Sequence, residues 1–138
     1  MPDLPLTGGC LCGGVRYELD QPPTAAGYCH CTRCQRRTGT AAAASARIVP
    51  GSLRVVAGEE LIGVFRPPDG FLKEFCSACG GALWSRDPDD PENLGVRMGS
   101  FDGDPGVRPQ WRQFVDFAAA WEPIPDDGLP RYGGRRPS

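Results

Sequence analysis

The stretch FLKEFCSACGGALWS, residues 71–85, places a CxxC pair between two largely apolar runs. Short apolar or alternating runs bounded by glycine are typical of β-strands. The pair itself, Cys76 and Cys79, is followed by Gly80 and Gly81, and glycine permits the tight turn in which backbone amides point at sulfur. The stretch therefore predicts a strand, a metal-binding knuckle and a second strand.

A second close pair, Cys10 and Cys12, is also followed by two glycines. Side chains at i and i+2 of an extended chain point to the same side, so both sulfurs can reach one ion. Two glycine-backed pairs that lie far apart in the sequence suit a closed zinc site with four thiolates. We predict this structural zinc site at Cys10, Cys12, Cys76 and Cys79. Buried cysteines without a metal are the alternative interpretation.

The remaining three of the seven cysteines lie in CHCTRC, residues 29–34. Cys29 and Cys31 share a strand face and Cys34 returns one turn later. All three can therefore hold one ion and leave a fourth position open for water or substrate. His30, the only histidine, should point away from them, and we interpret it as a structural residue rather than as a ligand.

The chemistry of a three-thiolate site points to thiols as partners. Three thiolates on Zn²⁺ leave a net charge of about −1, which makes the ion a weak activator of water. Such an ion is better suited to binding an external thiol and removing its proton, and the resulting thiolate would attack an electrophilic carbonyl. Arg33, Arg36 and Arg37 could hold carboxylates of that thiol, and we favour Arg36 as the substrate-binding residue. A solvated or thiolate-neutralising face is the alternative role for these arginines.

The rest of the chain is also typical of short strands. Residues 15–19 and 94–98 alternate between apolar and other side chains, and residues 53–56 and 61–65 predict a hairpin. The alanine-rich run at residues 40–46 fits a helix or a strand, and its length and flanking glycine and proline favour a strand. The acidic, proline-containing segment 87–92 predicts an exposed loop, because it lacks the regular ligand spacing of a calcium site.

Length, composition and the short-strand pattern predict a single, mainly β domain whose turns are held by metal. The chain has 138 residues, with 19 glycines and 15 prolines that interrupt long helices, and no run long enough to span a membrane. Its N-terminus lacks the features of a secretory signal, so we expect a cytoplasmic protein with reduced thiols. A net charge of −2 and the absence of a basic stripe argue against nucleic acid as a partner.

The cysteine motifs, taken in order, resemble those of the family of glutathione-dependent formaldehyde-activating enzymes and centromere-protein-V domains. The matching segments are GGCLCGGVRY at residues 8–17, CHCTRCQRRTG at 29–39, FCSACG at 75–80, GSFD at 99–102 and WEPIPDDGLP at 121–130. One difference is Arg112-Gln113, where many members of the family carry a His-Ile pair.

This resemblance implies a zinc-binding domain of small β-sheets clasped by zinc knuckles over residues 6–132. The composition of the C-terminal segment, which offers few core residues, predicts a flexible tail at residues 133–138. It implies two Zn²⁺ ions, a structural one at the four paired cysteines and a catalytic one at Cys29, Cys31 and Cys34. The implied reaction adds a glutathione-like thiol to formaldehyde or another small aldehyde, giving an S-hydroxymethyl adduct in a carbon–sulfur lyase type of chemistry. A non-catalytic, zinc-stabilised binding or carrier module is the alternative function.

Overall fold

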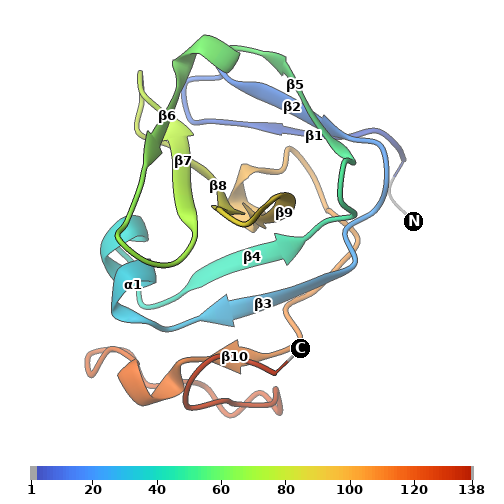
Figure 1. Ribbon diagram of the computed structural model, residues 1–138. Helices are drawn as coiled ribbons and strands as arrows, with labels where there is room; N and C mark the ends of the chain where they lie inside the picture. The colour runs from blue at the N-terminus through green and yellow to red at the C-terminus, as the bar shows by residue number, and fades with distance from the viewer. Residues whose placement is uncertain (1–2, 138) are drawn as a thin grey trace.

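The structure is a computed structural model that describes residues 3–137. As predicted, the chain is mainly β, with strands in two sheets and a single seven-residue α-helix within those residues, α1 (Thr32–Thr38). Figure 1 shows the smaller sheet above the larger one, with α1 at the end of β3 and the C-terminal segment beside β10. Within residues 3–137, no helix is both long and apolar enough to cross a membrane.

The smaller sheet has three strands in the order β1 (Leu6–Gly9), β2 (Arg16–Leu19) and β5 (Leu53–Ala57). Its neighbours are antiparallel, and β2 alternates buried and half-buried side chains as predicted from the sequence. This sheet therefore turns one face toward the core.

The larger sheet has seven strands in the order β10-β3-β4-β9-β8-β7-β6. Its neighbours are antiparallel except for β10 and β3, which run parallel. The bounds of the strands are β3 (Ala25–Cys29), β4 (Ala43–Arg47), β6 (Ile62–Phe65), β7 (Leu72–Cys76), β8 (Ala82–Asp87), β9 (Asp90–Arg97) and β10 (Arg112–Gln113).

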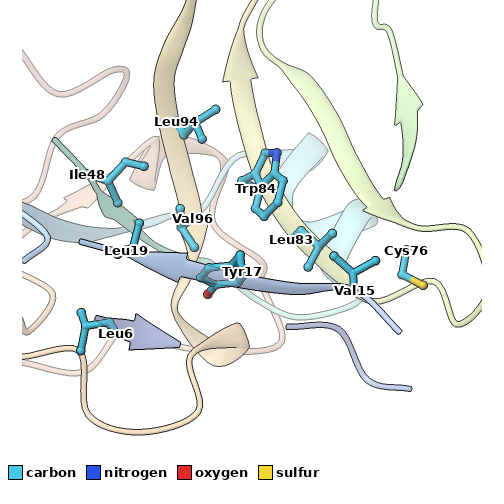
Figure 2. Packing of buried hydrophobic residues seen from close by; sticks show 10 residues of the cluster. All are labelled: Leu6, Val15, Tyr17, Leu19, Ile48, Cys76, Leu83, Trp84, Leu94 and Val96. Carbon is cyan, nitrogen blue, oxygen red and sulfur yellow. The ribbon is translucent and has the colours of Figure 1, made fainter. Parts of the chain in front are cut away.

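The core lies between the two sheets. Figure 2 shows Tyr17 and Leu19 of the smaller sheet packed with Trp84 and Val96 of the larger one, and all four side chains are fully buried. The rings of Tyr17 and Trp84 meet edge to face, with centroids 5.7 Å apart. Because side chains alternate along a strand, Ser85 and Arg97, which follow Trp84 and Val96, project from the opposite face of the larger sheet, where they line the candidate site.

The predicted hairpin between residues 53–56 and 61–65 is wrong, although both segments are strands. β5 pairs with β2 in the smaller sheet, and β6 pairs with β7 in the larger one. The reason is the turn at Gly58, which has a φ of 77° and approaches the backbone of Gly14 so closely that a Cβ would lie 2.0 Å from its carbonyl oxygen. This turn passes the chain from one sheet to the other instead of folding it back.

Two other local predictions can be compared with the fold. The run at residues 40–46 enters strand β4, with Ala43 and Ala46 buried, so the preference for a strand is confirmed. The acidic segment 87–92 is a hairpin tip rather than a free loop, because β8 and β9 continue into it and Asp87 pairs with Asp90. The predicted strand, knuckle and strand at residues 71–85 correspond to β7, the turn after it, and β8.

Candidate metal centres and the cavity beside them

The two glycine-backed cysteine pairs come together where the turn after β1 meets the turn after β7. All four sulfurs lie within 4.8 Å of one another, and they belong to Cys10, Cys12, Cys76 and Cys79. Mutually close sulfurs from two separate turns form the donor set that a tetrahedral Zn²⁺ prefers. The residues present therefore fit a metal ion.

Backbone N–H groups surround these sulfurs. The N–H of Val15 donates to Cys10 Sγ at 3.2 Å, and the N–H of Gly14 donates to Cys12 Sγ at 3.4 Å. The N–H of Cys12 donates to Cys79 Sγ at 3.4 Å. This hydrogen bond, together with a second one from the N–H of Gly81, lowers the pKa of Cys79 to about 6. Donors directed at sulfur stabilise thiolates. The N–H of Gly14 acts in this direction on Cys12, but the pairing of Cys12 with Cys10 and Cys79 raises the pKa of its thiol to about 11, so ionisation of all four cysteines needs a cation.

The other three cysteines converge at the corner where β3 turns into α1. Cys29 ends β3, Cys31 is the N-cap of α1, and Cys34 lies in the first turn of that helix. Their sulfurs lie within 4.8 Å of one another, and the N–H of Cys34 donates to Cys31 Sγ at 3.3 Å. A strand end and a helix start thus bring three donors together from one short segment.

Ionisation of this trio is shared among its sulfurs. The thiols of Cys29 and Cys34 donate to Cys31 and lower its pKa to about 2, whereas the same pairing with Cys31 and Cys34 raises the pKa of Cys29. One sulfur therefore carries negative charge readily, and full ionisation of all three needs a compensating cation. The chemistry of the donor set fits a thiophilic metal ion.

His30 is buried on the other side of this corner, with only 4% of its surface exposed. Its Nε2 lies 3.2 Å from Nη1 of Arg112, and burial together with the charge of Arg112 lowers the pKa of the imidazole. Arg112 also donates to Asp127 at 2.8 and 3.2 Å and stacks 4.3 Å over the ring of Tyr28. Arg112 thus joins the C-terminal segment to β3.

A cavity of about 320 Å³ opens above the three-cysteine corner, on the sheet face opposite the core. Side chains from β3, β4, β7, β8 and β9 line its floor, including Ser45 and Ser85, and Trp111, Phe71 and Phe114 supply apolar walls. No Asp or Glu lines it among the residues that the structure describes. Its cationic side chains are Arg33, Arg47, Lys73, Arg97 and Arg135.

Arg97 is the most deeply buried of these cations, with 9% of its surface exposed. Its Nη1 donates to Ser45 Oγ at 2.6 Å, but its Nε and Nη2 have no hydrogen-bond partner in the structure. No carboxylate lies within ion-pair distance of Arg97 or Lys73 in residues 3–137. The neighbouring groups that can carry opposite charge are the sulfurs of the trio, because Cys34 interacts electrostatically with both cations. Without a carboxylate partner, buried cations favour thiolates and other anions on this face of the sheet.

The three arginines singled out in the sequence have different surroundings. Arg33 pairs with Asp69 at 2.6 Å at the rim of the cavity, and Arg37 donates to the backbone oxygen of Glu74 at 2.8 Å. Arg36, our predicted substrate-binding residue, does not line the cavity above the three cysteines. It lines a separate cavity of about 590 Å³ beside Phe65.

Sequence reasoning missed the other cations of the cavity. The sequence did carry one signal for Arg97, which lies in the largely apolar run LGVRM directly after Val96. Because neighbouring side chains of a strand project from opposite faces, a buried Val96 implies that Arg97 projects away from the core. Arg47 and Arg135 gave no such signal, since only the pairing of strands and the path of the C-terminal segment bring them to the same cavity.

Comparison with known proteins agrees with this architecture. Residues 5–116 match the family model described as glutathione-dependent formaldehyde-activating enzyme. A relative from Halomonas elongata, named as a candidate glutathione-dependent formaldehyde-activating enzyme, is 31% identical over 105 residues, which are 72% of this chain and 67% of that protein. A crystal structure of a Rhodobacter sphaeroides protein superposes with a TM-score of 0.59 at 26% identity, over 91% of this chain and 98% of that one. The chain therefore belongs to the family of glutathione-dependent formaldehyde-activating enzymes.

Proposed function

We propose that this protein catalyses the addition of a glutathione-like thiol to formaldehyde or another small aldehyde in the cavity above Cys29, Cys31 and Cys34. The observation that carries the proposal is the convergence of three sulfurs at the floor of a cavity lined by cations and without acidic side chains. The family and the name of the Halomonas relative support the same activity. The product is an S-hydroxymethyl adduct, formally a substrate of a carbon–sulfur lyase.

The two cysteine clusters have different roles in this proposal. We expect the four-sulfur cluster to hold a structural Zn²⁺ and the three-sulfur cluster to hold a catalytic one. When bound by three thiolates, zinc supplies an open coordination position that lowers the pKa of an incoming thiol. Every other contribution comes from the side chains of the cavity.

The reaction forms one sulfur–carbon bond and involves no oxidation. The sulfur of the thiol bonds to the aldehyde carbon, the π electrons of the carbonyl move to its oxygen, and the proton of the thiol ends on that oxygen. Arg97 and Lys73 place positive charge beside the trio, where it stabilises both the thiolate and the developing oxyanion. The apolar wall formed by Phe71 and Trp111 restricts water around the adduct.

The proton needs a carrier other than histidine. His30 is held by Arg112, and no carboxylate lines the cavity in the described part of the chain. Lys73 is half-buried, and burial lowers the pKa of its ammonium group, which brings it closer to the range useful for proton transfer. We assign Lys73 as the group that returns the proton to the aldehyde oxygen.

The test measures adduct formation against its uncatalysed background. Zinc-loaded protein is mixed with glutathione and ¹³C-formaldehyde, and the exchange rate between free and thiol-bound formaldehyde is measured by NMR. We expect the protein to raise the rate and Cys34→Ser to return it to background while the four-sulfur zinc is retained. A wild-type rate equal to the background for glutathione and for other small thiols would reject the enzyme and leave a binding module.

A further inference from the structure

The cavity above the three cysteines extends along the larger sheet and carries two cations at its far end. Arg47, at the end of β4, stacks over Phe71 at 5.7 Å between guanidinium and ring centre. Arg135 comes from the C-terminal segment and lines the same cavity. Arg47 lies between the second and third cysteine motifs of the sequence, and Arg135 lies beyond the residues matched by the family model.

These two arginines repel each other, and neither forms an ion pair with an Asp or Glu of residues 3–137. Burial and the charges of Arg135 and Arg136 lower the pKa of Arg47, so the like charges are close enough to interact. Asp87 attracts Arg47 but forms no ion pair with it. The carboxylate of Asp87 already accepts hydrogen bonds from the N–H of Asp89 at 2.9 Å and from the side chain of Asn93 at 3.2 Å. Like charges held together without a counter-ion favour an anionic ligand.

Strand register gives the distance between this end and the sulfurs. Cys29 lies opposite Ala43, and Arg47 is four residues further along β4, opposite Ala25. Four residues of a strand span about 13 Å. An extended chain of three residues spans about 10 Å, and the arginine side chain reaches over part of the remainder. A thiol of tripeptide size can therefore touch both ends, whereas a two-carbon thiol cannot.

Arg97 lies between the two ends, because Ser45, which accepts its hydrogen bond, is midway between Ala43 and Arg47. The cavity thus has sulfur ligands at one end, a buried cation in the middle and a pair of cations at the far end. This order matches a molecule that carries a thiolate, then a polar backbone, then a carboxylate.

We propose that Arg47 and Arg135 form a carboxylate subsite that selects an extended, acidic thiol for the three-cysteine centre. The inference rests on the proposed function for the identity of the reacting group, but the subsite itself recognises a carboxylate. It deepens that function by assigning thiol specificity to two residues at the far end of the cavity.

Calorimetric titration of the zinc-loaded protein tests the subsite with four probes. Glutathione offers thiol and carboxylates, its dimethyl ester offers only the thiol, S-methylglutathione offers only the carboxylates, and 2-mercaptoethanol is a short neutral thiol. The variants are Arg47→Gln and Arg135→Gln. Arg108→Gln is the matched control, since it removes the same charge from an exposed pair with Asp104. Thermal unfolding establishes that each variant is folded, and Arg135 is exposed, so its variant remains informative if Arg47→Gln does not fold.

We expect esterification to weaken binding of glutathione to the wild type by about tenfold, as loss of a charge-assisted hydrogen bond predicts. Each arginine variant should weaken glutathione and S-methylglutathione by about fivefold to tenfold and leave 2-mercaptoethanol unchanged. The control should change none of them.

The outcomes separate the subsite from the reaction. Equal binding of glutathione and its ester, or an equal loss for 2-mercaptoethanol in the variants, would overturn the subsite and leave thiol addition in place. If no thiol binds at the metal but S-methylglutathione still binds and loses affinity in Arg135→Gln, the subsite stands and the proposed reaction falls.

Discussion

The two cysteine clusters share one ligand chemistry but differ in what surrounds them. Around the four-sulfur cluster, backbone N–H groups of Gly14, Val15 and Cys12 point at the sulfurs. Beside the three-sulfur cluster lie a cavity and long cationic side chains, among them Arg97 and Lys73. Short backbone donors enclose the first cluster, whereas the cavity leaves room for a ligand at the second. The difference supports our proposal that the first cluster holds the fold and the second one reacts.

The largest expected effect is on folding, from a substitution in the four-sulfur cluster. The cluster ties the turn after β1 to the turn after β7, and Cys76 is part of the buried core. We expect Cys79→Ser to lose zinc and with it the cooperative fold, because binding of a structural zinc contributes on the order of 10 kcal/mol. Circular dichroism during thermal unfolding and zinc analysis measure both losses.

Cys34→Ser is the matched control, since it removes a thiol from the other cluster. Its sulfur lies in the first turn of a seven-residue helix at the surface of the larger sheet, outside the buried hydrophobic cluster. We expect the melting transition to stay cooperative. A cooperative, zinc-free Cys79→Ser protein, or an unfolded Cys34→Ser protein, would reverse the roles assigned to the two clusters.

The second prediction concerns removal of zinc. A competing chelator should withdraw the ion of the three-sulfur cluster first, because three ligands and an accessible cavity hold it less firmly than four ligands do. Chelator titration followed by zinc release and by far-ultraviolet circular dichroism should show two stages, with loss of structure only in the second. Simultaneous release of both ions with unfolding would mean that the clusters are not energetically distinct.

The third prediction is a trade between stability and ligand binding at Arg97. Replacing this buried cation with methionine removes a charge that has no carboxylate partner in residues 3–137. We expect Arg97→Met to raise the free energy of unfolding by about 1 kcal/mol and to weaken glutathione binding by about tenfold. Chemical denaturation and calorimetry provide the two measurements. Lower stability together with unchanged binding would mean that Arg97 is only a structural residue.

Comparison of the sequence predictions with the structure shows where local patterns suffice. The metal-binding turn at residues 76–79 could be predicted because the CxxC spacing, the two glycines and the flanking strands all lie within a few residues of one another. The pairing of β5 with β2 was not, because it depends on contact between Gly58 and Gly14 across 44 residues. The cationic lining of the cavity could not be predicted for the same reason, because Arg47, Arg97 and Arg135 come from three distant segments of the chain. The motif arginines drew attention to α1 instead, where Arg36 lines a different cavity.

The smallest expected effect on ligand binding comes from substitution of Arg36, because this residue lines a different cavity from the one above the three cysteines. Arg36 lies in α1 with Cys34 but lines the cavity beside Phe65, whereas Arg97 lines the cavity above the sulfurs. A charge at an exposed position outside the cavity is screened by solvent, so it should add little to the binding of a thiol. We expect Arg36→Ala to change glutathione affinity and the rate of adduct formation by less than about twofold. A loss as large as that of Arg97→Met would instead show that the substrate crosses from one cavity to the other past Arg33 and Lys73, which line both.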